Sequence, residues 1–200
     1  MVEGAKSVLE LLDSDFETVM LLGTEKFLQD TTLPGGCNVI AVSGKELEGL
    51  GEFRSNNGAL AVAKMKKNAS PGVLPSEFVL MLDDISDPGN LGTIIRTADW
   101  FGIHKVICSE ETADLYNPKV ISATMGSFTR VSVFYTDLSS FLADSKLKVF
   151  GAFLEGEDIH RIGGVAGGII LIGSESHGIG SELERFVTTR LTIPRYGKAE

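Results

Sequence analysis

The sequence predicts an α/β protein in two parts, a small α/β layer followed by a larger, mostly parallel sheet covered on both faces. Two observations predict this fold class. Short apolar runs of strand length alternate along the chain with stretches of helical length, which is typical of α/β layers. Residues 64–76 lose this alternation and collect Lys, Pro, Gly and Ser, which indicates a linker between the two parts.

The first part, predicted as a domain at residues 1–72, alternates short helices with short apolar strands. We expect three helices, at 7–12, 25–29 and 45–50, and three strands, at 19–22, 39–42 and 59–63.

The second part, predicted as a domain at residues 73–200, contains longer and more apolar strands. We expect strands at 78–82, 105–108, 131–134, 148–153, 169–172 and 191–193. Helices are expected between them, at 91–101, 118–125, 138–145 and 181–186. Strands that alternate with helices in this way favour a mostly parallel sheet.

Composition excludes several classes of protein. Of the 200 residues, 43% are apolar, enough for a core, and the net charge of −9 argues against a DNA-coating protein, so any nucleic-acid contact must be local. Cys37 and Cys108 have no Cys or His at ligand spacing, so neither a disulfide framework nor a metal site is expected. The acidic start and apolar runs of about five residues predict a cytoplasmic chain without a membrane span.

The first informative stretch, residues 82–98, runs from an apolar strand through an acidic turn into a helix. Asn90 is expected at the N-cap position, and Arg96 follows six residues later, so both can border a cleft at the carboxyl end of the strand. The alternative is purely structural, in which Asp87 or Asn90 caps the helix and Arg96 pairs with a surface acid.

The second stretch, residues 169–180, is an apolar strand followed by a Gly-rich turn. It is not a P-loop, because Ile179 and Gly180 stand where Lys and Ser or Thr are required, and it lacks the Gly-x-Gly-x-x-Gly pattern of dinucleotide sites. Two interpretations remain, a backbone that approaches a ligand at Gly173 beside Glu175, or a tight strand-to-helix turn. His177 is interpreted as a surface or capping residue rather than a base. A third stretch, residues 191–200, is uninformative alone.

Taken in order, the three stretches resemble the signature motifs of the SpoU-type (TrmH-like) RNA 2′-O-ribose methyltransferases of the SPOUT class. Residues 87–98 are similar to the first motif, residues 173–178 to the second, and Ile193-Pro194 with Gly197 to the opening of the third. Residues 122–131 are similar to a segment between the motifs. Residues 2–8 are similar to the start of the L30e-like RNA-binding domain that many members carry.

The resemblance implies a fold, a cofactor and a set of site residues. The second domain would be an α/β trefoil knot that forms a homodimer and binds S-adenosyl-L-methionine at the knot, with rRNA or tRNA as substrate and no metal. The motifs imply a catalytic set of Asn90, Arg96 and Glu175. They place Gly173 and Ile193 at the cofactor, together with a loop around Phe153 and Leu154. Because a guanidinium stays protonated, we expect Arg96 to hold a phosphate or the developing alkoxide.

Two other functions remain as alternatives. A non-catalytic RNA-binding protein could keep the fold, although the presence of Asn90, Arg96 and Glu175 argues against it. A nicotinamide oxidoreductase would need the missing dinucleotide pattern. The third motif of the family continues with Ser-Leu-Asn, whereas this sequence stops at Glu200, so we expect the natural protein to continue.

Overall fold

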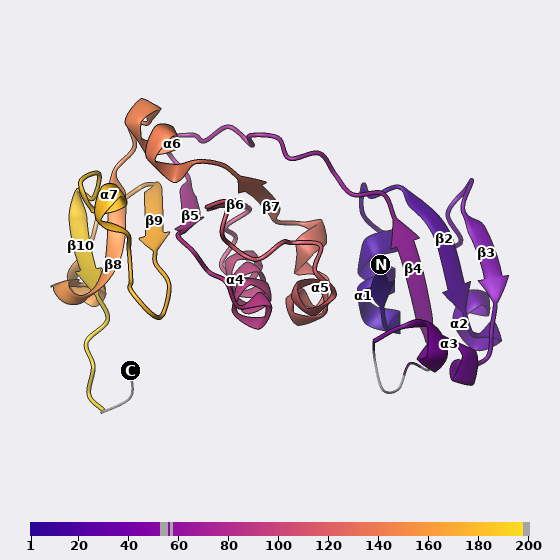
Figure 1. Ribbon diagram of the computed structural model, residues 1–200. Coiled ribbons are helices and arrows are strands. Elements are labelled where there is room, and N and C mark those ends of the chain that lie inside the picture. The colour runs from indigo at the N-terminus through magenta and orange to yellow at the C-terminus, as the bar shows by residue number, and fades with distance from the viewer. Residues whose placement is uncertain (53–55, 57, 198–200) are drawn as a thin grey trace. The chain divides into compact units, whose positions relative to one another are not determined.

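The computed structural model of the chain describes residues 1–52, 56 and 58–197, within which the strands form two sheets (Figure 1). The first sheet has the strand order β1-β4-β2-β3. Its strands are Val2–Glu3 (β1), Thr18–Gly23 (β2), Asn38–Ala41 (β3) and Ala59–Ala63 (β4). The helices of this region are Ala5–Leu12 (α1), Glu25–Gln29 (α2) and Gly44–Leu50 (α3). The predicted elements are confirmed, and β1 was not predicted because two residues give no periodic signal.

Local chemistry fixes where the short helices begin. Thr24 Oγ1 accepts the Phe27 N–H at the start of α2, and Ser43 forms a reciprocal capping box with Glu46 at the start of α3. Leu22, Leu47 and Leu60 bury their side chains together and form the core of this sheet.

The second sheet is entirely parallel and has the strand order β10-β8-β9-β5-β6-β7. Its strands are Phe78–Leu82 (β5), Lys105–Cys108 (β6), Ser132–Tyr135 (β7), Val149–Asp158 (β8), Gly168–Ile172 (β9) and Thr189–Thr192 (β10). The α/β class and the parallel sheet are therefore confirmed, and the trefoil knot remains a prediction.

Helices α6 and α7 cover one face of the parallel sheet. The helices that follow the linker are Pro88–Trp100 (α4), Pro118–Thr124 (α5), Leu138–Asp144 (α6) and Ser181–Glu184 (α7), with 3₁₀ turns at Ser127–Thr129 (η1) and Ile159–Arg161 (η2). Leu138, Leu142 and Leu183 pack on strand residues such as Met81 and Ile169, and these side chains are buried. In the part of the chain that the structure describes, no helix is long and apolar enough to cross a membrane.

The predicted start of helix α4 is wrong. Helix α4 begins at Pro88, so Asn90 lies in the first turn of the helix and not at the N-cap position. The physical reason is that proline fixes φ near the helical value and lacks the N–H that the first turn would leave unpaired, so the helix can begin at Pro88 itself.

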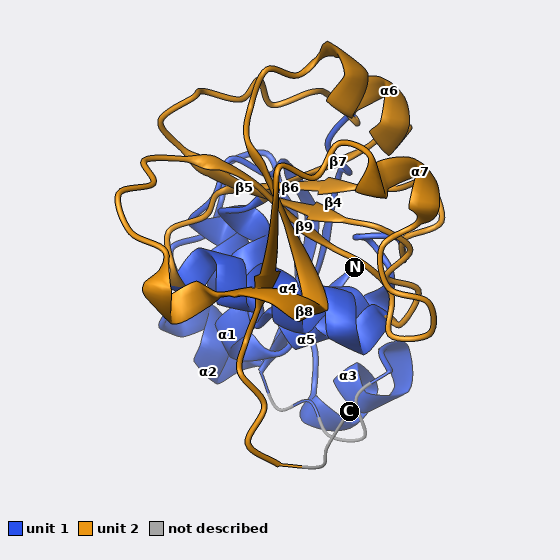
Figure 2. Ribbon diagram, turned by 90° about the vertical axis from the view of Figure 1, so that its left-hand side faces the viewer, with its two compact units in different colours: residues 1–67, 88–100, 114–131 blue, residues 68–87, 101–113, 132–200 orange. Residues whose placement is uncertain are grey.

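The chain divides into two compact units (Figure 2). One contains Met1–Lys67, Pro88–Trp100 and Asp114–Val131, and the other contains Asn68–Asp87, Phe101–Ala113 and Ser132–Glu200. Residues 64–76 contain neither helix nor strand, as expected of the predicted linker. Because both units include segments from beyond this linker, the domain boundary at residue 72 stays a prediction.

Candidate active site

The parallel sheet reverses its strand order between β5 and β9. Strands β6 and β7 continue on one side of β5, and strands β8 and β10 lie beyond β9 on the other. In open parallel sheets, ligands bind at the carboxyl ends of the strands beside such a reversal. Here those ends are Leu82, followed by Asp83 and Asp84, and Ile172, followed by Gly173. The start of the first informative stretch and the second stretch therefore meet at this edge.

A closed loop, which we call the glycine turn (residues 173–180), follows β9. Ser174 and Gly178 exchange backbone hydrogen bonds of 3.1 and 2.9 Å, leaving Glu175, Ser176 and His177 as an exposed tip. A Cβ on Gly173 would lie 2.0 Å from the backbone of Gly178, so only glycine allows the loop to close. Of the two interpretations of Gly173, the tight strand-to-helix turn is therefore correct for the path of the backbone.

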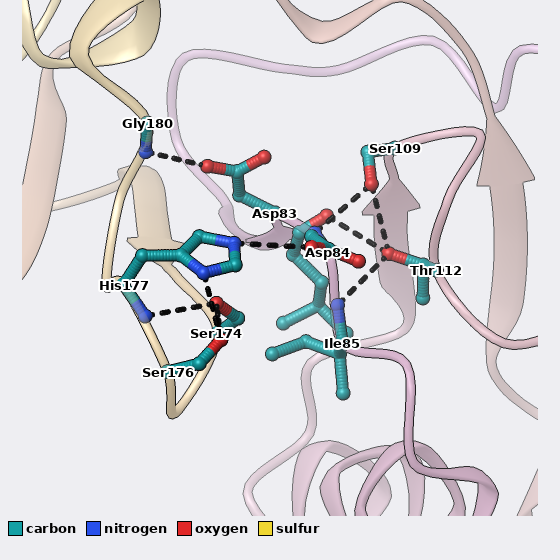
Figure 3. A network of polar contacts seen from close by, with 10 residues as sticks. Asp83, Asp84, Ile85, Ser109, Thr112, Ser174, Ser176, His177 and Gly180 are labelled. Carbon is teal, nitrogen blue, oxygen red and sulfur yellow. Dashed lines mark hydrogen bonds and ion pairs between the residues drawn. The ribbon is translucent and has the colours of Figure 1, made fainter.

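Two carboxylates at the end of β5 contact this turn (Figure 3). The Gly180 N–H donates to Asp83 Oδ2 at 2.7 Å, and His177 Nε2 lies 3.1 Å from Asp84 Oδ2. The other ring nitrogen of His177 lies 2.7 Å from Ser176 Oγ. With Asp84 ionised, Nε2 carries a hydrogen, and in the neutral ring the Ser176 hydroxyl donates to Nδ1. His177 is exposed, as expected of a surface residue, and its contact with Asp84 was not predicted.

The backbone after β5 is held from the side of β6 as well. The Asp84 N–H donates to Ser109 Oγ at 3.0 Å, and the Ile85 N–H donates to Thr112 Oγ1 at 3.3 Å. Both hydroxyl side chains are buried and lie 3.1 Å from each other (Figure 3). Asp84 adopts a φ of 55°, in the left-handed region that non-glycine residues rarely occupy. This rare conformation points to a functional constraint on the loop.

The predicted catalytic residues lie on two elements. Asn90 and Arg96 are exposed on α4, and Glu175 is exposed at the tip of the glycine turn. Among the described residues, no ion pair involves Arg96, so the structure does not bear out its predicted alternative of a surface ion pair. Because α4 and the glycine turn belong to different compact units, the joint action of the three residues remains a prediction.

The predicted cofactor residues lie on β8, β9 and β10, which are neighbours in the sheet. Gly173 directly follows β9, and Ile193, 74% exposed, directly follows β10. Leu154 is 93% exposed. It lies in the part of β8 that does not pair with β10, because Arg190 pairs with Gly151 and the next residue, Leu191, pairs with Glu157.

Phe153, by contrast, packs against the sheet core beneath the guanidinium of Arg190, which lies 3.6 Å from the ring centroid. Of the two predicted β8 side chains, only that of Leu154 is therefore fully open to a ligand. Residues 198–200 of the third stretch lie outside the described residues.

An open cavity of about 380 Å³ lies on the β6 and β7 side of the same edge. Its lining includes five acidic residues, namely Asp83, Glu110, Glu111, Asp137 and Glu182. Such a lining repels phosphate, so an RNA backbone is not expected there. Nearby, Cys108 is buried, and burial raises the pKa of its thiol far above the ordinary value, so it is no nucleophile. In the described ranges, no group of three or more His, Cys, Asp or Glu could hold a metal ion.

Comparison with known proteins places this sheet and its loops in a defined class. The SpoU rRNA Methylase family matches residues 77–200. The 23S rRNA (guanosine(2553)-2′-O)-methyltransferase RlmP of Bacillus subtilis is 28% identical over 204 residues, which cover 100% of this chain and 81% of that protein.

Solved structures extend the similarity to both parts of the chain. A TrmH-family protein from Porphyromonas gingivalis is 33% identical with a TM-score of 0.84, covering 99% of this chain and 81% of that one. An AdoMet-bound rRNA methyltransferase from Sinorhizobium meliloti is 28% identical with a TM-score of 0.85, covering 100% and 79%.

The parallel sheet, the two loops at its reversal and these similarities define an RNA methyltransferase of the TrmH type. The chain belongs to the SpoU rRNA Methylase family. The predicted family and enzyme class are confirmed.

Proposed function

We propose that the chain methylates a ribose 2′-hydroxyl in rRNA or tRNA, with S-adenosylmethionine as the methyl donor. The family match over residues 77–200 carries this proposal. The RlmP relative is named for ribose 2′-O-methylation, and the Sinorhizobium meliloti structure is described as AdoMet-bound. The missing dinucleotide pattern argues against a nicotinamide enzyme.

The predicted residues within β8 and directly after β9 and β10 fit the proposed cofactor. Leu154 and Ile193 are exposed apolar side chains on neighbouring strands, suited to a neutral aromatic base, and the Gly173 backbone lies on the adjacent strand. Phe153 contributes by packing beneath this segment rather than by touching the ligand. When bound, S-adenosylmethionine supplies an electrophilic methyl group on sulfur.

The protein then has to position the ribose and help remove its hydroxyl proton. Arg96, exposed on α4, stays protonated and donates hydrogen bonds to an RNA phosphate or to the developing alkoxide. Asn90, in the first turn of the same helix, orients the substrate through its amide. Glu175, at the exposed tip of the glycine turn, faces the reaction as a carboxylate that can accept a proton or a hydrogen bond.

Titration calorimetry tests the cofactor assignment directly. The protein should bind S-adenosylmethionine and its demethylated product saturably and should not bind NAD. Leu154→Asp should weaken the binding of S-adenosylmethionine at least about tenfold, since it places a charge where an apolar ligand surface would be desolvated. Leu33→Asp, also at an exposed leucine but in the first sheet region, is the matched control. Saturable NAD binding without a response to S-adenosylmethionine would reject the assignment.

We further propose that residues 1–72 supply RNA affinity and site choice rather than chemistry. Strands β2 and β3 are parallel, so the helices that follow them, α2 and α3, begin at the same edge of the first sheet. Each helix carries an exposed lysine at its second position, Lys26 and Lys45. Two cations at one edge suit a phosphate backbone, even though the whole chain is acidic.

Filter binding over a range of salt concentrations tests this division of labour. Replacing Lys26 and Lys45 together by Ala should weaken RNA binding and reduce the slope of log K against log salt by about 2, or about one per phosphate contact. The affinity for S-adenosylmethionine should stay unchanged. Lys146→Ala, at an exposed lysine of the other unit, is the control. An unaltered salt slope in the double variant would count against the proposal.

We also propose that the chain acts in the cytoplasm as a homodimer through its second domain. The neighbouring residues Trp100 and Phe101 are 85% and 74% exposed, and exposed aromatic side chains of this size suit a protein interface. Sedimentation equilibrium should give twice the chain mass for the wild type and a weaker dimer for Trp100→Ser.

A further inference from the structure

We propose that Asp83 and Asp84 are positioning residues for methyl transfer, because they hold the glycine turn against β5 at the reversal of the sheet. This inference rests on the proposed function, in which Glu175 acts from the tip of that turn. Both residues come directly after β5, and both contact the turn that follows β9, although these segments are more than 90 positions apart in the sequence.

The glycine turn has a fixed shape, and its Ile179 packs in the sheet core, but its tip is exposed. Its backbone closure between Ser174 and Gly178 is reinforced by the Ser174 hydroxyl, which lies 3.3 Å from Ser176 Oγ and accepts the backbone N–H of His177 at 3.4 Å. All of these bonds lie within the turn, so they determine its conformation and not its tilt relative to the sheet. The tip residues Glu175, Ser176 and His177 are exposed.

Asp83 supports the turn at its far end. Its carboxylate accepts the N–H of Gly180, the residue that precedes α7, at 2.7 Å (Figure 3). A hydrogen bond to an ionised acceptor is stronger than one between neutral groups. A Cβ on Gly180 would lie 3.3 Å from the same carboxylate oxygen, so the close approach favours glycine there.

Asp84 supports the turn at its tip. The contact between its Oδ2 and His177 Nε2 ties the ring to β5, and the contact between Nδ1 and Ser176 holds the opposite side of the ring. His177 follows Glu175 by two residues, so fixing the imidazole restricts where the Glu175 carboxylate can lie. Ser109 and Thr112 hold the backbone around Asp84.

The left-handed backbone of Asp84 is the observation that separates this arrangement from an ordinary surface contact. Aspartate adopts this φ more readily than most residues, and here bonds from both neighbouring loops hold it in place. If the turn were released, Glu175 would be displaced relative to the sheet, and a displacement of about 1 Å at a reacting group can cost about 100-fold in rate.

The conformation of Asp84 also dictates the variants. Asp84→Ala would combine loss of the carboxylate with backbone strain, so Asp84→Gly, which tolerates a positive φ, isolates the loss of the contact. Asp84→Asn keeps an acceptor oxygen and also tolerates this conformation. Asp83→Ala and Asp83→Asn form the equivalent pair for the Gly180 contact. Glu111→Ala removes an exposed carboxylate at the same edge that lines the cavity and is the matched control.

Two measurements on the full chain test the proposal. The first is steady-state methyl transfer to 23S rRNA, in which Asp84→Gly and Asp83→Ala should lower kcat about 10- to 100-fold with KM for RNA within about threefold. Asp84→Asn and Asp83→Asn should restore most of the activity, and Glu111→Ala should match the wild type. The second is hydrogen exchange followed by mass spectrometry, in which the Ala and Gly variants should exchange faster in peptides covering 173–180 and not in peptides from the first sheet.

The outcomes separate this proposal from the one on which it rests. Unchanged exchange in the glycine turn of Asp84→Gly and Asp83→Ala would overturn the supporting role of the carboxylates, whatever the activity. Faster exchange with unchanged kcat would overturn their role in methyl transfer. A wild-type protein that methylates no RNA would overturn the proposed function, and the exchange measurement would still decide whether the carboxylates hold the turn.

Discussion

Arg96 is the single residue on which the proposed chemistry depends most. It lies exposed on α4, six positions after Asn90, and no ion pair of the described residues engages it. A guanidinium that stays charged at every accessible pH is a donor and not a base. Its contribution is therefore a preorganised positive charge near the phosphate or the reacting oxygen.

Replacing Arg96 by Ala should abolish methyl transfer and leave the affinity for S-adenosylmethionine within a few fold. Removing one preorganised donor costs about 2.7–4 kcal/mol of transition-state stabilisation, or about 10²–10³ in rate. Single-turnover kinetics with saturating cofactor measures the loss, and calorimetry of the same variant measures cofactor affinity. Normal turnover in Arg96→Ala would show that the residue has another role.

At the residue scale, the motifs predicted which residues are candidates for the site better than they predicted which residues contact one another. Asn90, Arg96 and Glu175 were singled out by spacing and resemblance, and all three are exposed, as substrate-facing groups must be. The pairing of His177 with Asp84 could not be predicted, because the two lie 93 positions apart and meet only through the order of β9 and β5 in the sheet. Nor does any sequence signal indicate the positive φ of Asp84.

At the scale of elements, the buried central strands were predictable and the irregular edges were not. Strands β5 and β6 begin and end at their predicted bounds, Phe78–Leu82 and Lys105–Cys108. Strand β8 extends to Asp158, five residues beyond its predicted end. Its polar second half pairs with β10 only after a register shift, and a periodic pattern cannot reveal such an irregularity. Helix α4 begins early because Pro88 suits a first turn.

The glycine at position 92, within the first motif, is explained by packing of α4 on α5. A Cβ there would lie 2.5 Å from Ala123 Cβ and 2.7 Å from the Val120 carbonyl oxygen. Gly92→Ala should therefore destabilise the protein by about 1–3 kcal/mol, although alanine is the better helix former. Urea unfolding measures the change.

Gly49→Ala provides the matched control for Gly92. Gly49 also lies inside a helix, α3, but has open space where a Cβ would stand. The helix propensity of alanine should there act alone and stabilise the protein by about 0.5–1 kcal/mol. Equal effects of the two substitutions would contradict the packing explanation for Gly92.

At the scale of the whole molecule, the alternation of strands and helices was sufficient to predict the α/β class and the irregular backbone of residues 64–76. The division of the chain at residue 72 stays a prediction, and α4 and α5 belong to the same compact unit as the first sheet. The apolar face of a helix can pack on one sheet or on the other. Periodicity shows that a helix has such a face but not which partner covers it.

The central claim is that this chain transfers a methyl group to a ribose 2′-hydroxyl, and mapping of ribose methylation tests it most directly. Unmodified 23S rRNA and tRNA transcripts are incubated with the protein and S-adenosylmethionine, and the products are hydrolysed with alkali and analysed by mass spectrometry. We expect one alkali-resistant 2′-O-methylated nucleotide at a single position, absent with Arg96→Ala and missing from the RNA of cells that lack the gene. Methylation confined to a base, or no transfer to any of these RNAs, would contradict the claim.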